Sequence, residues 1–144
     1  MTDSTDIQLP DQGYGSVADA ANLIQDACHS ASVAGGWWHC PDTGVYLGDT
    51  DGAGMKRNTG QMLMLCVSEL AEAMEGDRKD LMDDHLPHRK MMEVELADAV
   101  IRICDLAGGK GYDLGGAIAE KLAYNAQRAD HKLENRAKAG GKKY

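Results

Sequence analysis

The stretch from Met91 to Ala107 reads MMEVELADAVIRICDLA, and it decides the fold of this chain. Its apolar residues are distributed almost all the way round a helix, which is typical of a buried helix. At about 100° per residue, four of its polar side chains share one narrow sector. These polar residues are Glu95, Asp98, Arg102 and Asp105. The pattern therefore predicts a buried helix with a polar slot along one side.

A second helix is predicted before this one, at about Gly60 to Lys79, with Asn58-Thr59 as a cap at its start. Its apolar face carries Met62, Leu65, Cys66 and Ala73. Glu69 lies in the middle of that face and Glu72 at its border. The two helices therefore each direct acidic side chains toward an apolar interior.

Two further helices complete the prediction. Ser16 is expected to cap a first helix at about 17–33, which Gly35-Gly36 ends. A fourth helix is expected at about 113–138. The fold class is all-α, with four to five helices in a bundle-like arrangement. We expect a flexible N-terminus at 1–15, a single domain at 16–138 and a frayed C-terminus at 139–144.

Composition excludes several classes of function. A net charge of −8 argues against a nucleic-acid-binding surface, which should be basic. No apolar run approaches roughly 18 residues, and no signal pattern opens the chain, so we expect no membrane span. The four cysteines are scattered without a C-x-x-C pair, which argues against a zinc knuckle or a disulfide framework. A reducing, cytoplasmic location fits this composition.

Two pairs of acids carry the predicted chemistry. Glu69-x-x-Glu72 and Glu95-x-x-Asp98 each place two carboxylates on one side of a helix, because residues three apart lie close together there. Buried acids are costly unless a cation neutralises them. Carboxylate oxygens suit Mg²⁺, with Mn²⁺ as a substitute, and four acids could hold two ions. One such pair alone would indicate only a solvated helix face.

A cationic stripe follows in the last predicted helix. Lys121, Asn125, Arg128 and Lys132 recur at spacings of four, three and four. Lysine and arginine at such positions can bind phosphate oxygens. We therefore expect a triphosphate to lie between metal ions held by the acids and the Lys121–Arg128 stripe.

Together these motifs resemble the MazG-like all-α nucleoside triphosphate pyrophosphohydrolases. The family signature is E-x-x-E, a variable gap and E-x-x-D. Here it reads Ser68-Glu69-Leu70-Ala71-Glu72, then 22 intervening residues, then Glu95-Leu96-Ala97-Asp98. The stretch from Lys121 to Arg128, KLAYNAQR, is similar to the family's Lys/Asn/Arg helix. The resemblance covers roughly Asn58 to Arg136, which is more than half of the chain.

The resemblance implies Mg²⁺-dependent cleavage of the α–β phosphate bond, giving a nucleoside monophosphate and pyrophosphate. It also implies a homodimer or homotetramer. The predicted metal ligands and catalytic residues are Glu69, Glu72, Glu95 and Asp98. One departure concerns the base: many members have two adjacent acids at the start of the motif, where this chain has Ser68 before Glu69. The role of that acid falls here to water, Glu72 or Glu75.

Several other residues are weighed as possible contacts to the substrate or to the metal. Trp37-Trp38-His39 could stack on a nucleobase, or could anchor a long loop to the helices. Tyr124 and Asn125 are candidates for sugar or base contacts. Lys79, Arg89 and Lys90 could reach phosphates, although charged loop ends are usually solvated. His85 and His88 are poor ligands for a hard ion such as Mg²⁺. Arg102 and Asp105 are expected to support the site from behind or to form a pair within their helix.

Three rival functions remain. Phosphoribosyl-ATP pyrophosphohydrolase of histidine biosynthesis would use the same acids. A di-iron bundle is disfavoured, because it needs Glu-x-x-His on two helices. A helical interaction module would need enough bases to pair with the acids, and few lie nearby. Related short proteins, some from phages, act on purine deoxynucleotides, which favours dGTP or dATP as substrate.

Overall fold

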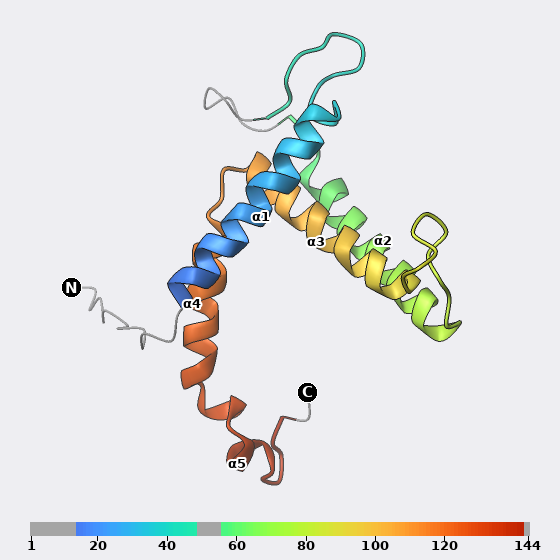
Figure 1. Cartoon of the computed structure of the whole chain (residues 1–144). Helices are drawn as coiled ribbons and strands as arrows, with labels where there is room; N and C mark the ends of the chain where they lie inside the picture. The colour runs from blue at the N-terminus through green and yellow to red at the C-terminus, as the bar shows by residue number, and fades with distance from the viewer. Residues whose placement is uncertain (1–13, 49–55, 143–144) are drawn as a thin grey trace, which may run out of the picture. The chain divides into compact units, whose positions relative to one another are not determined.

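The computed structural model describes residues 14–48 and 56–142. Its α-helices are α1 (Tyr14–Ala34), α2 (Thr59–Arg78), α3 (Met91–Gly109), α4 (Leu114–Gln127) and α5 (Leu133–Arg136), with a 3-10 turn η1 (Ala129–His131) (Figure 1). The described residues contain no strand, only two isolated β-bridges. The all-α class is therefore confirmed. None of the helices in the described ranges is long and apolar enough to cross a membrane.

The chain divides into two compact units. One unit is Leu23–Asp113, and the other combines the residues up to Asn22 with those from Leu114 onward. The single domain expected at 16–138 stays a prediction. Most of the predicted N-terminal lead-in, and the last two residues of the predicted frayed tail, lie outside the described residues.

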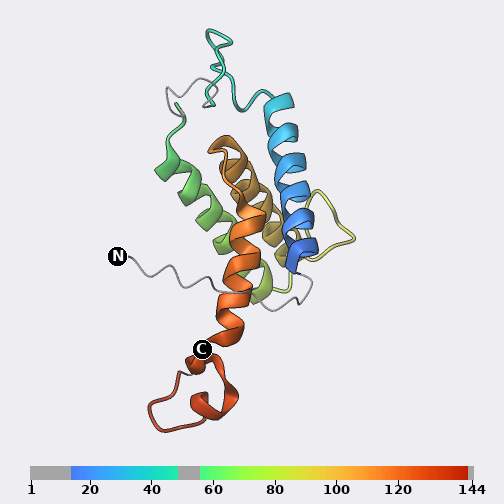
Figure 2. The ribbon, with the colours of Figure 1, turned by 90° about the vertical axis from the view of Figure 1, so that its left-hand side faces the viewer.

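In the first unit, α2 and α3 form an antiparallel hairpin (Figures 1 and 2). The predicted cap is confirmed, because the Asn58 side-chain oxygen accepts a hydrogen bond from the Gln61 N–H at 3.0 Å. At the hairpin's closed end, a Cβ added to Gly76 would lie 2.9 Å from the Met91 Cβ. A residue without a side chain is therefore required for this close approach.

The end of α1 packs against the end of α3. A Cβ added to Gly108 would lie 2.6 Å from the His29 Cβ, so the two backbones come very close there. The predicted stop at Gly35-Gly36 is confirmed, since Gly36 has a φ of 84°, which glycine adopts without strain. The predicted cap at Ser16 is wrong. The helix already begins at Tyr14, because extending a formed helix costs little.

The prediction that α3 is buried on nearly every side is wrong. Several of its apolar residues are about half exposed. These residues are Met92, Leu96, Val100, Ile101 and Ile103. Within this unit α2 covers one side of α3, and the end of α1 covers only its C-terminal part. The remaining apolar surface of α3 is left open.

The fourth helix was also predicted incorrectly. A continuous helix at 113–138 was expected, but α4 ends at Gln127 and Arg128 has an extended backbone (φ −68°, ψ 124°). Between Ala126 and Leu133 the sequence offers no large apolar side chain to pack. Because packing of an apolar face supplies most helical stability, the chain breaks into η1 and α5 there. Lys132 therefore does not continue the stripe of α4.

Candidate metal centre

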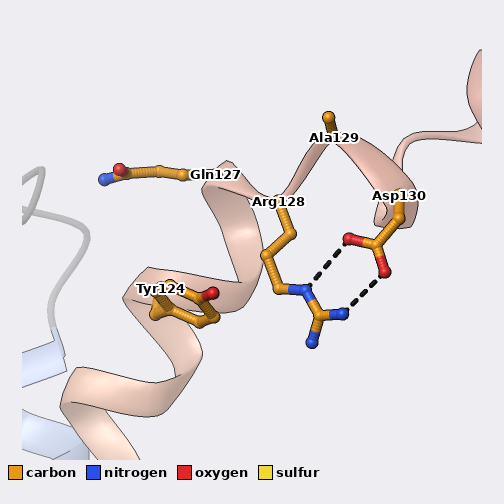
Figure 3. Close-up of a pocket in the computed structure, with 5 residues that line it drawn as sticks. All are labelled: Tyr124, Gln127, Arg128, Ala129 and Asp130. Atoms are coloured by element: carbon orange, nitrogen blue, oxygen red, sulfur yellow. Dashed lines mark hydrogen bonds and ion pairs between the residues drawn. The ribbon is translucent and has the colours of Figure 1, made fainter.

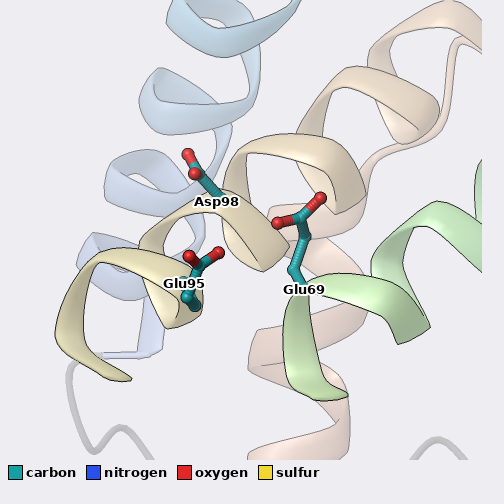
Figure 4. Close-up of side chains that lie close together, drawn as sticks. All are labelled: Glu69, Glu95 and Asp98. Atoms are coloured by element: carbon teal, nitrogen blue, oxygen red, sulfur yellow. The ribbon is translucent and has the colours of Figure 1, made fainter. Parts of the chain in front are cut away.

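Three of the four predicted ligands lie together in the α2–α3 hairpin. Glu69 of α2 and Glu95 and Asp98 of α3 each offer a carboxylate oxygen, and these oxygens all lie within 4.8 Å of one another (Figure 4). Glu69 is 6% exposed and Glu95 is 8% exposed, while Asp98 is half-buried. The expectation that Glu69 lies in the middle of a buried face is confirmed.

In the described part of the chain, one cation contacts this cluster directly. The Arg102 Nε donates a hydrogen bond to the Glu69 Oε1 at 2.5 Å. Arg102 lies one turn beyond Asp98 on α3, so its ion pair crosses from α3 to α2. The alternative of an Arg102–Asp105 pair within the helix is therefore wrong. One guanidinium faces three carboxylates, and the cluster keeps an excess of negative charge.

Burial and this excess of negative charge together change the protonation of Glu95. Burial raises the pKa of Glu95, and a hydrogen bond with Glu69 and the charges of Glu72, Glu69 and Asp98 raise it further, to about 7. A carboxyl group with this pKa carries a proton for part of the time at neutral pH. A cation of higher charge would displace that proton, because it would stabilise the ionised form.

The donor set fits a hard divalent ion. Mg²⁺ takes oxygen ligands at about 2.0–2.1 Å in octahedral geometry, which places its ligand oxygens about 3–4 Å apart. The three carboxylate oxygens lie within 4.8 Å of one another, so small side-chain movements would bring them to one ion. No histidine or cysteine belongs to this group, which favours a hard ion over a soft one.

Glu72, the fourth predicted ligand, lies at the edge of the cluster. Its side chain is exposed, and it is not one of the three residues whose oxygens gather within 4.8 Å. Its charge nevertheless contributes to the raised pKa of Glu95. Ser68, the residue before Glu69, donates its hydroxyl to the Leu65 carbonyl at 2.8 Å. That hydroxyl is therefore engaged with a backbone carbonyl of α2.

Asp105 forms a second acidic centre on α3, with different neighbours. Its carboxylate accepts hydrogen bonds from the Trp38 indole N–H at 2.7 Å and the Ser32 hydroxyl at 2.9 Å. The His29 Nδ1 also lies 2.9 Å away, and the Arg57 guanidinium lies at 3.7 Å. Through these contacts Asp105 connects α3 to the end of α1, to the loop that follows α1, and to the residues just before α2. Sequence reasoning missed this role, although Asp105 stood in the polar sector of α3.

The two tryptophans of the loop after α1 differ in burial. Trp38 is fully buried, with its ring against His29, Arg57 and Gly109, so it anchors the loop. Trp37 is 71% exposed and remains available to a ligand.

The predicted cations around the hairpin's closed end are held by local acids. Lys79 pairs with Glu75 at 2.5 Å, Arg89 with Glu93 at 2.6 Å, and Lys90 with Asp80 at 2.6 Å. His85 and His88 are exposed in the same connection. Each of these three basic side chains would have to exchange its partner to bind a phosphate.

The other unit holds the predicted phosphate and sugar contacts. The Lys121 ammonium lies 4.8 Å and the Arg128 guanidinium 5.9 Å from the centre of the Tyr124 ring. Arg128 also makes two hydrogen bonds to Asp130, and both line a pocket of about 600 Å³ with Tyr124 (Figure 3). The Asn125 Oδ1 is buried and has no hydrogen-bond partner within 14–48 and 56–142. An acceptor in this state calls for a donor from outside the described residues.

Comparison with known proteins adds no assignment. No family model, no curated protein and no solved structure matches this chain. The MazG-like resemblance therefore rests on the motif residues themselves and stays a prediction.

Proposed function

We propose that this chain is a Mg²⁺-dependent nucleoside triphosphate diphosphohydrolase. It cleaves the α–β phosphate bond of a nucleoside triphosphate and releases a nucleoside monophosphate and pyrophosphate. The observation that carries the proposal is the gathering of Glu69, Glu95 and Asp98 within 4.8 Å at a largely buried position. These are three of the four acids of the E-x-x-E and E-x-x-D motifs.

The charge of the cluster supports this proposal over a structural role. In a salt-bridge network the acids would be matched by bases, as in the helical interaction module. Only Arg102 is paired with any of the three acids among the described residues. Burial and the remaining charge together raise the pKa of Glu95 to about 7, which is a cost to the folded protein without a bound cation.

The three acids would hold the ion, with the Arg102 guanidinium beside Glu69. A bound divalent ion supplies a more acidic water and neutralises charge on the phosphate oxygens. In the hydrolysis, a water oxygen forms a new bond to phosphorus as the anhydride bond to pyrophosphate breaks. The water loses one proton to a base.

Glu72 is the best candidate for that base among the side chains left open by the sequence. Glu75 is paired with both Arg78 and Lys79, so its two carboxylate oxygens are already engaged. Ser68 carries no basic group, and its hydroxyl is bound to the Leu65 carbonyl. Glu72 is exposed and lies close enough to Glu95 to raise the pKa of that residue.

The substrate contacts remain part of the proposal. Lys121, Tyr124, Asn125 and Arg128 are the candidates for phosphate, sugar and base contacts, and exposed Trp37 is the candidate for stacking on a base. The proposed substrates are purine deoxynucleoside triphosphates, dGTP or dATP. Phosphoribosyl-ATP is the alternative substrate, because the same acids would serve its hydrolysis.

The direct test is a panel of all common ribo- and deoxyribonucleoside triphosphates, and phosphoribosyl-ATP, with Mg²⁺ or Mn²⁺. Pyrophosphate and orthophosphate are measured separately. We expect pyrophosphate and a nucleoside monophosphate. Release of orthophosphate alone would indicate a different bond, and no release from any substrate with either ion would favour the interaction module.

A binding measurement separates the metal centre from the reaction. Isothermal titration of the unsubstituted chain with Mn²⁺ should show binding that Glu69→Gln and Asp98→Asn each weaken strongly. Glu93→Gln is the matched control, because Glu93 is an exposed acid on α3 paired with Arg89. Equal Mn²⁺ binding by all three variants would refute the metal centre.

A further inference from the structure

Two of the four free cysteines of this chain are in contact with each other. Cys28 lies on α1 and Cys104 on α3, and their side chains are joined by a hydrogen bond. The other two have different partners. The Cys66 thiol donates to a carbonyl of its own helix at 3.4 Å, and the Cys40 thiol is hydrogen-bonded with Thr43. The fold therefore selects one pair of thiols that are far apart in the sequence.

The backbones of α1 and α3 come close together at this pair. The residues that follow the two cysteines are in contact, since the His29 Nδ1 lies 2.9 Å from the Asp105 Oδ1. One turn beyond Cys104, a Cβ added to Gly108 would lie 2.6 Å from the His29 Cβ. Helix axes about 8–10 Å apart bring facing Cα atoms to roughly 4–6 Å, and a disulfide needs about 4.4–6.8 Å between them. Rotation of the two side chains is therefore enough to join the sulfurs.

The two thiols differ in exposure. Cys28 is half-buried, whereas Cys104 is 5% exposed. Burial raises the pKa of the Cys104 thiol, and the neighbouring Cys28 raises it further. Because a thiol must lose its proton to act as a nucleophile, Cys104 is not the thiol that reacts first. Cys28 is the one that an oxidant can reach, and Cys104 is held beside its sulfur for the second step.

We propose that Cys28 and Cys104 are a modification site, at which hydrogen peroxide converts the two thiols into a reversible disulfide between α1 and α3. The Cys28 thiolate attacks a peroxide oxygen, the O–O bond breaks, and a sulfenic acid and one water are formed. The Cys104 thiolate then attacks the Cys28 sulfur, forms the S–S bond and expels the sulfenic oxygen as a second water. The two thiols lose two electrons in total, and the peroxide gains them.

The disulfide reinforces a contact that hydrogen bonds already make. It lies beside Asp105, whose bonds to His29 and Ser32 join the same two helices. A cross-link between segments far apart in the sequence restricts the unfolded chain, so the oxidised protein should melt at a higher temperature. Asp98 of the metal centre lies about 9 Å earlier along α3, so Mn²⁺ binding should not change. This inference rests on the contact between thiols and does not depend on the proposed hydrolysis.

Oxidation of the purified full chain by a small excess of hydrogen peroxide tests the proposal. The remaining thiols are blocked with iodoacetamide in denaturant, and the protein is digested without reductant for mass spectrometry. We expect one cross-linked peptide pair that contains Cys28 and Cys104 and that dithiothreitol separates. The number of free thiols should fall from four to two. The melting temperature should rise on oxidation and return on reduction.

Serine substitutions supply the matched controls. Cys28→Ser and Cys104→Ser should each form no disulfide and show no rise in melting temperature on oxidation. Cys40→Ser and Cys66→Ser keep the pair, so each should still form the cross-link with unchanged yield. Oxidation in urea should give no preferred pair, because the fold no longer holds the two thiols together.

Three results would overturn the proposal. The first is recovery of Cys28 and Cys104 from the oxidised unsubstituted protein as separately alkylated peptides, which needs no variant to fold. The second is a disulfide that joins Cys40 or Cys66 in place of this pair. The third is an equal yield of the Cys28–Cys104 cross-link in urea. Mn²⁺ titration before and after oxidation keeps this outcome separate from that of the metal centre.

Discussion

Two acidic centres lie on α3, and they differ in what surrounds the carboxylate. Asp105 is met by donors: an indole N–H, a hydroxyl, an imidazole and a more distant guanidinium. Glu95 is met mainly by other acids, Glu69, Glu72 and Asp98. A buried carboxylate with enough donors stabilises the fold, whereas buried carboxylates facing one another need a cation. Burial alone does not distinguish the two cases, but the neighbours do.

The largest effect should come from removing a charge at the cation-deficient centre. Glu69→Gln or Asp98→Asn should lower pyrophosphate release by more than about 100-fold, because the ion loses a ligand. Thermal stability without metal should stay the same or rise. Activity and melting temperature are measured on the same preparations, with Glu93→Gln as control. Activity retained in both variants would contradict the role of Glu69 and Asp98 as ligands of a catalytic ion.

Removing the carboxylate of Asp105, the centre that is rich in donors, should lower the stability of the fold and leave metal binding unchanged. Asp105→Ala leaves the donors of Trp38, Ser32 and His29 without their acceptor, and should cost about 2–4 kcal/mol of unfolding free energy. Urea unfolding measures this cost. Mn²⁺ affinity, measured on the fraction that remains folded, should be unchanged. A stable Asp105→Ala protein would show that Asp105 is not the anchor of the loop.

The raised pKa of Glu95 predicts a specific pH dependence. Its pKa is about 7 in the folded chain and about 4.3 when unfolded, so the folded state binds more protons between these values. The contribution of Glu95 to unfolding free energy therefore falls as pH rises from about 4.5 to 7. Glu95→Gln should remove this fall and stabilise the metal-free protein at pH 8 by roughly 1–3 kcal/mol.

Urea unfolding of the wild type and of Glu95→Gln at pH 5 and pH 8 measures the difference. Mg²⁺ should raise the melting temperature of the wild type more at pH 8 than at pH 5, because the ion competes with the proton on Glu95. An equal stability difference between the two proteins at both pH values would contradict the shifted pKa.

The smallest effect concerns Arg102, the one cation found at the cluster in the described structure. Arg102→Gln removes a positive charge from beside Glu69, so Mn²⁺ should bind a few-fold more tightly. Arg102→Lys keeps the charge and should bind Mn²⁺ close to the wild-type affinity. Titration calorimetry compares the three proteins. Weaker binding by Arg102→Gln would mean that Arg102 orients Glu69 more than it competes with the ion.

Local patterns predicted the hairpin well, for a physical reason. The positions of α2 and α3, the Asn58 cap and the burial of Glu69 and Glu95 all follow from helical periodicity and cap chemistry, which act over a few residues. The prediction of a continuous C-terminal helix failed, because its continuity depends on packing that residues 127–132 cannot provide. The partners of Asp105 could not be predicted either, since they come from segments about 70 residues earlier in the chain.

The sequence by itself determined that the chain is helical, and that Glu69 and Glu95 lie on buried faces of their helices. Both follow from the period of the α-helix, which is a local property. Only the tertiary structure decided which acids meet. It brought Glu69, Glu95 and Asp98 together, left Glu72 at the edge, gave Asp105 its donors, and left part of the apolar surface of α3 open. These outcomes depend on the register between helices, which is set by contacts between residues far apart in the chain.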